Sequence, residues 1–139
     1  MDATEYLMQI NEIDEAIELL RYDIEYWKSV AEGSGTGSEG ERVQSSSNQK
    51  KMEAAVVKYI QLETEVKALE KKKDEILATI KQLQFQEYQM IHKIYIQGKM
   101  IKEIVYEKKK SYSWGTMMHK RALTNLQKIL DERGRKNGY

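Results

Sequence analysis

With 139 residues, the chain has room for one domain or for two small ones. It contains no cysteine, which excludes disulfides and thiolate metal sites, and no proline. Its charged content of 32% and mean hydropathy of −0.72 are typical of long amphipathic helices, and no stretch approaches the roughly 18–20 apolar residues that span a bilayer. The first residues are acidic, unlike a secretory signal, so we expect a reducing, cytoplasmic location without a membrane partner.

Charge is distributed unevenly along the chain. From Met90 onward there are 12 Lys and Arg residues against 4 Asp and Glu, a net charge of +8, whereas residues 1–89 hold 11 against 18, a net charge of −7. A basic C-terminal third predicts contact with a polyanion such as nucleic acid. The alternative is that the acidic and basic parts attract each other, within one molecule or between two.

Residues 1–31 are predicted to form an amphipathic helix. Its apolar positions alternate four and three residues apart, which indicates a helix packed along another helix: Tyr6, Ile10, Ile13, Ile17, Leu20, Ile24 and Trp27. Residues 32–49 are rich in Gly and Ser, and that composition predicts a flexible linker.

Residues 50–84 are predicted to form a long, coiled-coil-like helix. The same spacing recurs there and is broken only by a lysine, at Met52, Ala55, Tyr59, Leu62, Val66, Leu69, Lys73, Ile76, Ile80 and Leu83. The linker is long enough to reverse the chain, so an antiparallel helical hairpin is the simplest use of both apolar seams. Homodimerisation through the long helices is the alternative.

Residues 85–139 are predicted to form a domain of three helices with a basic tail. The first helix directs Phe85, Tyr88, Ile91, Ile94 and Tyr95 inward and ends at Gly98. The long helix before it either runs on into this helix without a break or breaks near residues 84–87. The second helix runs from Lys99 to about Glu107, with Met100, Ile101, Ile104 and Val105 inward. The third begins at a Ser113 cap, runs to about Glu132 and is ended by Gly134, with Met118, Ala122, Leu126, Ile129 and Leu130 inward.

The last two of these helices, joined by a turn of four or five residues, match a helix-turn-helix pattern. In that motif the third helix presents its outer face to the major groove of DNA, and flanking basic residues contact phosphates. The candidate DNA-binding residues are the lysines of the turn and the outward positions of the third helix: Lys108, Lys109, Lys110, Ser113, Trp114, Thr116, Met117, Lys120, Arg121 and Thr124. Lys120 or Arg121 could reach guanine edges, and Thr116 could contact a thymine methyl group.

The sequence from Tyr95 to Leu130 resembles region 4 of bacterial sigma factors, and more closely the small phage late-gene regulators of the ArpU and RinA kind. The resemblance is carried by residues 95–98, 102–104, 111–113 and 119–123, and upstream by residues 41–47 before the LETEV helix. It implies an all-α, helix-turn-helix regulator that binds promoter DNA and acts with RNA polymerase on late genes.

Three positions depart from the pattern that this resemblance implies. Val105 stands where a small residue is usual, the three lysines at 108–110 replace an apolar residue, a glycine and an apolar residue, and Gly115 replaces a branched apolar residue. We expect a size exchange, in which the side chain of Val105 fills the space left at Gly115. The lysine turn would be compensated only if Tyr106 or Tyr112 folds inward.

No motif for catalysis or metal binding stands out, so we expect neither enzymatic activity nor a cofactor. The two histidines lie far apart; His119 is expected to be packed and hydrogen-bonded, and His92 to be structural. For Trp114, stacking on DNA and covering the core are both open. Two classes of function remain: a DNA-binding regulator, and a helical interaction protein that contacts polymerase or another partner without reading DNA.

Overall fold

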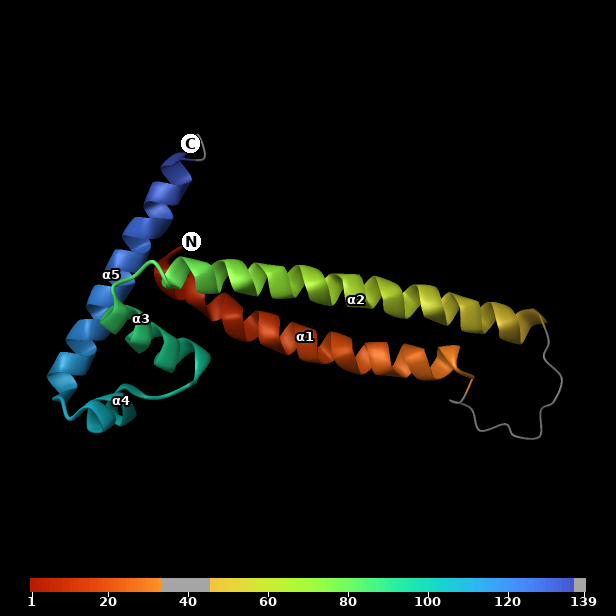
Figure 1. Cartoon of the computed structure of the whole chain (residues 1–139), viewed down its shortest axis with the longest axis horizontal. Coiled ribbons are helices and arrows are strands. Elements are labelled where there is room, and N and C mark those ends of the chain that lie inside the picture. The colour runs from red at the N-terminus through yellow and green to blue at the C-terminus, as the bar shows by residue number, and fades with distance from the viewer. Residues whose placement is uncertain (34–45, 137–139) are drawn as a thin grey trace. The chain divides into compact units, whose positions relative to one another are not determined.

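The computed structural model describes residues 1–33 and 46–136, and all regular secondary structure in these ranges is helical. This confirms the all-α class. The elements in chain order are α1 (Ala3–Ala31), α2 (Ser46–Ile80), α3 (Phe85–Ile91), the short π-helical segment η1 (His92–Ile96), α4 (Ile101–Lys108) and α5 (Tyr112–Lys136) (Figure 1).

The break after α2 falls at residues 81–84 and meets the predicted stretch, 84–87, at Gln84. The backbone tightens there, because the amides of Gln82 and Leu83 each donate to a carbonyl only three residues back, at 3.1 Å. Gln84 is then extended, with ψ of 148°, which ends the helical path without a glycine. At its other end α2 begins at Ser46, earlier than the predicted residue 50. The rest of the predicted linker lies almost entirely outside the described residues.

The chain forms two compact units whose limits lie inside α1 and α2. Unit 1 comprises Met1–Ile13 and Lys72–Tyr139, and unit 2 comprises Asp14–Lys71. The predicted segments, 1–31, 32–49, 50–84 and 85–139, follow the helices and the linker, and they stay a prediction. The first turns of α1 belong to unit 1: the amide of Ala3 donates to Oε1 of Gln127 at 2.7 Å, and Leu7 is completely buried.

Unit 2 is a pair of antiparallel helical segments. Its apolar contacts fall on positions that the sequence periodicity predicted, namely Ile24, Leu62 and Val66, with Ile17, Leu20, Trp27 and Tyr59 packed around them. Two ion pairs flank this seam, Arg21 with Glu70 at 2.9 Å and Lys28 with Glu63 at 3.5 Å. Residue numbers rise on one helix as they fall on the other, so the two segments run in opposite directions.

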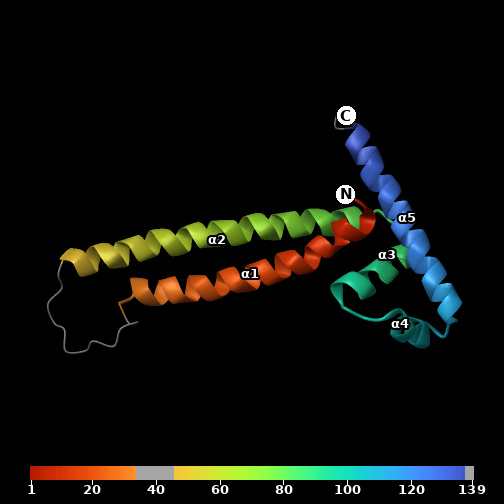
Figure 2. The same cartoon turned by 180° about the vertical axis from the view of Figure 1, so that it is seen from behind.

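In unit 1, α3 and α4 both pack against α5 (Figures 1 and 2). A core cluster joins one residue from each of the three helices, Met90, Ile104 and Met118, with Ile94 and Trp114 packed against it. Two residues predicted to face inward do not. Met100 is 57% exposed because it precedes α4 in extended backbone, and Phe85 is 67% exposed because Glu87 takes the inward position on α3.

Both predicted limits of α5 are wrong. The cap is Ser111 rather than Ser113: the amide of Trp114 donates to Oγ of Ser111 at 3.1 Å, and the helix starts at Tyr112. At the other end the helix continues through Gly134 to Lys136. A glycine ends a helix when it takes a positive φ, as Gly98 does at +72°, and Gly134 does not.

The expected size exchange between Val105 and Gly115 is confirmed. A Cβ atom added to Gly115 would lie 2.5 Å from Cγ1 of Val105 and 2.8 Å from Cγ2 of Ile101. Gly115 is itself buried in α5. The two side chains of α4 therefore occupy the volume that a branched residue would otherwise fill, and α4 approaches the backbone of α5 closely.

We predict that Gly115→Ala destabilises the protein by about 1–3 kcal/mol, because the added methyl group overlaps two side chains of a packed core. The unfolding free energy from urea titration measures this. The double variant Gly115→Ala/Val105→Ala should be less destabilised than the sum of the two single variants, since the smaller side chain at position 105 makes room for the added methyl group.

Gly134→Ala is the matched control within the same helix. Nothing lies within 4 Å of a Cβ atom added there, so the substitution should leave stability unchanged or raise it by up to about 1 kcal/mol. Equal effects of the two alanines would contradict the close approach of α4 and α5 at Gly115.

Candidate nucleic-acid interface

The outer face of α5 carries most of the side chains that the sequence singled out. Six of them are exposed and lie three or four residues apart along one side of the helix: Ser113, Thr116, Met117, Lys120, Arg121 and Thr124. This surface, called here the α5 face, therefore combines hydroxyl, thioether and basic groups. Such a mixture can contact base edges, thymine methyl groups and phosphates.

Trp114 belongs to the core rather than to the α5 face. It is half-buried and packs against the cluster of Met90, Ile104 and Met118. The ammonium group of Lys110 lies 5.5 Å from the centroid of its ring, within the range of a cation–π interaction. The indole therefore covers the core from one side and supports a lysine of the turn.

The three consecutive lysines have three different environments. Lys108 ends α4, and its Nζ donates to Oε1 of Gln89 on α3 at 2.8 Å. Lys109 adopts the left-handed conformation, with φ of 58° and ψ of 44°, which favours glycine. Lys110 lies against Trp114. The turn therefore spans only residues 109–111, shorter than expected.

Tyr106 and Tyr112 do not fold inward to replace the apolar turn residues, since they are 84% and 59% exposed. They lie on either side of the turn in sequence, beside Lys109 and Lys110. A hydroxyl group on an exposed aromatic ring is a common phosphate contact. Both tyrosines are thus candidate interface residues that the sequence interpretation left out, although their position beside a lysine run could have indicated them.

Arg121 is held by α3. Its Nε donates to Oε2 of Glu87 at 2.7 Å and its Nη2 donates to Oε1 of Gln84 at 2.8 Å. The carboxylate of Glu87 is almost completely buried and also accepts a hydrogen bond from Nδ2 of Asn125 at 2.9 Å. Burying a carboxylate is costly unless it is paired and hydrogen-bonded. Arg121 therefore ties α5 to α3, while 43% of its side chain remains exposed.

The two histidines are packed and hydrogen-bonded within unit 1. Nε2 of His119 lies 3.0 Å from the hydroxyl of Tyr95, and burial lowers the pKa of His119 below 6.5. Burial also raises the pKa of Tyr95 above 10.0, an effect that a hydrogen bond from Thr4 partly offsets. Nδ1 of His92 accepts a hydrogen bond from Nε2 of Gln97 at 3.0 Å. His119 is therefore packed and hydrogen-bonded, as expected, and is not placed as a phosphate contact.

Two lysines offset the negative charge of Glu107 on α4. The carboxylate of Glu107 lies 3.0 Å from Nζ of Lys99 and 3.7 Å from Nζ of Lys93. The hydrogen bond and the charge of Lys99 lower the pKa of Glu107, which keeps it ionised and paired. The exposed Lys109, Lys110 and Lys120 therefore dominate the charge around the turn and the first half of α5.

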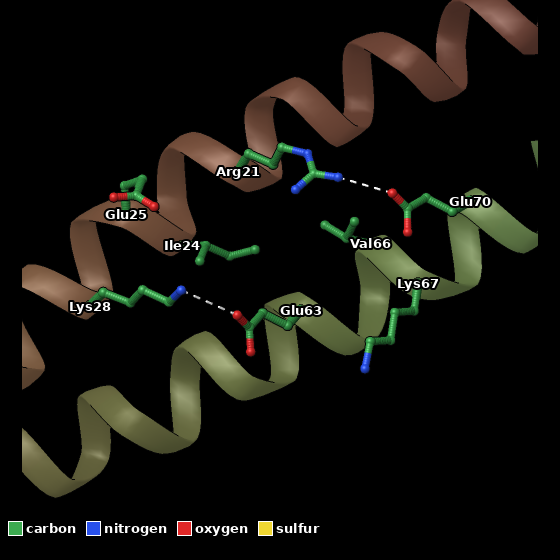
Figure 3. Close-up of a pocket in the computed structure, with 8 residues that line it drawn as sticks. All are labelled: Arg21, Ile24, Glu25, Lys28, Glu63, Val66, Lys67 and Glu70. Atoms are coloured by element: carbon green, nitrogen blue, oxygen red, sulfur yellow. Dashed lines mark hydrogen bonds and ion pairs between the residues drawn. The ribbon is translucent and has the colours of Figure 1, made fainter.

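Unit 2 contains a shallow groove between α1 and α2, lined by Ile24 and Val66 and by charged side chains (Figure 3). Each of the two ion pairs beside it, Arg21 with Glu70 and Lys28 with Glu63, bridges both helices. These side chains thus hold the two segments together. Such exposed, paired charges lack the burial that catalytic acid–base groups require.

Comparisons with known protein families, with characterised proteins and with solved structures give no significant match to this chain. Among residues 1–33 and 46–136, none of the helices combines the length and the apolar content that a bilayer-spanning helix needs.

We predict that Lys109→Gly stabilises the protein by about 0.5–1 kcal/mol. A side chain in the left-handed conformation is strained by about 1–2 kcal/mol, and glycine relieves this strain at some cost in chain entropy. Thermal or urea unfolding measures the change. Lys110→Gly is the matched control and should destabilise the protein, because its φ is not positive and its contact with Trp114 would be lost. Stabilisation by both glycines would contradict the assignment of strain to Lys109.

We predict that stability falls as the pH drops below about 6.5, because the unfolded chain then protonates His119 more readily than the folded protein does. The contribution of His119 to the free energy of unfolding is complete above pH 6.5. It is lost as the pH falls toward the lower pKa that His119 has in the folded protein. Urea unfolding at about pH 7.5 and about pH 5.5 measures this. His119→Gln should flatten the dependence. Tyr95→Phe should retain it, since burial of the imidazole is the cause; an unchanged slope in His119→Gln would contradict the prediction.

Proposed function

We propose that the chain is a phage or prophage-type transcriptional regulator of the ArpU and RinA kind, which binds promoter DNA and acts with RNA polymerase on late genes. In this proposal α4, the turn and α5 form a helix-turn-helix, completed by α3 and η1, and α5 is the recognition helix. The α1 and α2 segments form the antiparallel, coiled-coil-like hairpin. The observation that carries the proposal is the exposed α5 face beside a lysine-rich turn.

The chemistry of the α5 face suits the major groove. Lys120 can donate to the O6 and N7 acceptors of guanine, and Thr116 and Met117 offer apolar contact to thymine methyl groups. Lys109 and Lys110 precede the helix, where phosphate contacts set the register of a recognition helix. Ser113 and Thr124 add hydroxyl donors for phosphates along the same side.

The ion pair of Arg121 with Glu87 changes the DNA contact that we propose for Arg121. Because Glu87 and Gln84 hold the guanidinium, its bidentate geometry is already used within the protein. We assign it a phosphate contact through its exposed part and give base recognition to Lys120. Removing Arg121 would leave the buried carboxylate without its cation, so a loss of DNA binding in Arg121→Ala would not separate recognition from stability.

One observation favours the second candidate, a helical interaction protein that does not read DNA. Lys108 and Arg121, two of the basic residues assigned to DNA, also form hydrogen bonds to α3. Dependence on salt separates the two functions. A protein that neutralises several phosphates loses affinity steeply as salt rises, whereas an apolar contact between helices does not.

We predict that selection from random duplexes, performed at two salt concentrations, enriches a defined DNA sequence. Lys120→Ala should then weaken binding to that sequence by about 10- to 100-fold and relax the preference at one base pair. Lys110→Ala should weaken binding to all sequences similarly and reduce the salt dependence by about one phosphate contact. Fluorescence anisotropy with labelled duplexes measures both effects.

Lys58→Ala is the matched control, because it removes one exposed lysine from α2 and lies outside unit 1. Its affinity should stay within about twofold of the unaltered protein. No enriched sequence at either salt concentration, or equal losses in Lys120→Ala and Lys58→Ala, would overturn the DNA-binding proposal in favour of the interaction protein.

A further inference from the structure

The outer side of α1 in unit 2 carries an unusual row of apolar side chains. Leu19, Tyr22 and Tyr26 are 69%, 77% and 56% exposed, although each is large and apolar. Their spacing of three and four residues places them on one face of the helix, together with Glu15 one turn earlier. This row is called here the α1 stripe. Each of its apolar residues follows a residue of the internal seam, Ile17, Leu20 or Ile24, by two positions. Two positions are roughly half a turn of the helix, so the α1 stripe faces away from α2.

Acidic residues border the α1 stripe. Glu18, Asp23 and Glu25 are exposed beside it, and Glu15 continues it. A negatively charged border disfavours nucleic acid and anionic lipid as occupants. It also disfavours the α1 stripe of a second molecule, since the two acidic borders would then meet. The fitting partner is an apolar helix face that ends in positive charge.

The outer side of α2 has this composition. Val57 and Ile60 are 56% and 50% exposed, and the same face continues at helical spacing through Thr64, Lys67 and Lys71. This row is called here the α2 stripe. The exposed Ala54 and Ala68 border it, and such small side chains allow a neighbouring helix to approach closely. Its apolar half precedes its basic half, the reverse of the order along the α1 stripe.

We propose that the α1 stripe of one molecule packs antiparallel against the α2 stripe of a second copy of this chain. Both rows alternate four- and three-residue steps, as interdigitating helices require. In the antiparallel register, Glu15 lies opposite Lys71, Leu19 opposite the aliphatic stem of Lys67, and Tyr26 opposite Ile60. Opposite charges therefore meet at one end of the contact and apolar side chains at the other, with Tyr22 opposite Thr64 between them.

Like charges weigh against the other pairings of these faces. Two α2 stripes centred antiparallel on Val57 and Ile60 would bring Lys50 opposite Lys67 of the second copy, and like charges across an interface are costly. The α1–α2 contact is instead between two different surfaces, so it is heterologous, and each molecule that uses one stripe keeps the other for a further copy. The protein therefore associates progressively as its concentration rises. This inference is independent of DNA binding.

The test uses two double variants whose substituted residues are all exposed, so that the internal seam is untouched. Leu19→Gln/Tyr22→Gln removes the α1 stripe, and Val57→Gln/Ile60→Gln removes the α2 stripe. Sedimentation equilibrium of the full chain should show an average mass that rises with concentration. Each variant alone should associate at least about tenfold more weakly. Circular dichroism and thermal unfolding confirm that both variants remain folded.

The decisive measurement is the equimolar mixture of the two variants. Each variant keeps the stripe that the other has lost, so the mixture should form a complex with one molecule of each, and no larger species. Contact through two identical stripes would leave one variant fully associated alone and the mixture without a new complex, which would overturn the proposal. So would a constant monomer mass for the unaltered chain at all concentrations.

Charge reversal provides a second, independent readout. Glu15→Lys should weaken association, and mixing it with Lys71→Glu should strengthen association relative to either variant alone, because the opposed pair is restored with its signs exchanged. Phe85→Gln is the matched control for a lost exposed apolar side chain. It lies in unit 1 and should leave the average mass unchanged. A mixture no stronger than the single charge variants would contradict the proposed register.

Discussion

The missing side chain at Gly115 is the constraint on which the packing of unit 1 depends. Because no Cβ stands there, Val105 and Ile101 can lie directly on the backbone of α5. This contact sets how closely α4 approaches α5 and which side of α5 is left exposed. A branched residue at position 115 would require a smaller one at position 105. The volume that a branched residue at position 115 would fill is thus supplied from α4.

A second tie acts between α3 and α5, and it is polar. The buried carboxylate of Glu87 accepts hydrogen bonds from Arg121 and Asn125, so the two helices are held in one register by groups that would be costly to leave unpaired. Lys108 similarly reaches Gln89. Two basic residues of unit 1, Lys108 and Arg121, therefore stabilise the packing of its own helices. Around the turn and the first half of α5, the exposed basic residues are Lys109, Lys110, Lys120 and the partly paired Arg121.

The sequence predicted those features that depend on periodicity and on side-chain volume. The seam around Ile24, Leu62 and Val66 follows from apolar spacing, and the exchange between Val105 and Gly115 follows from volume. Local signals were less reliable, since serines at 111 and 113 compete to cap α5 and a glycine stops a helix only at positive φ. The burial of Glu87 depends on partners 34 and 38 residues away, which no local pattern reveals. DNA recognition by the α5 face stays a prediction.

The bond from the amide of Ala3 to the side chain of Gln127 joins groups 124 positions apart in the sequence. On the ribosome, the first turns of α1 are made early and must wait for most of the chain before their partner in α5 emerges. This hydrogen bond can therefore form only late in synthesis, and forming it closes a very long loop.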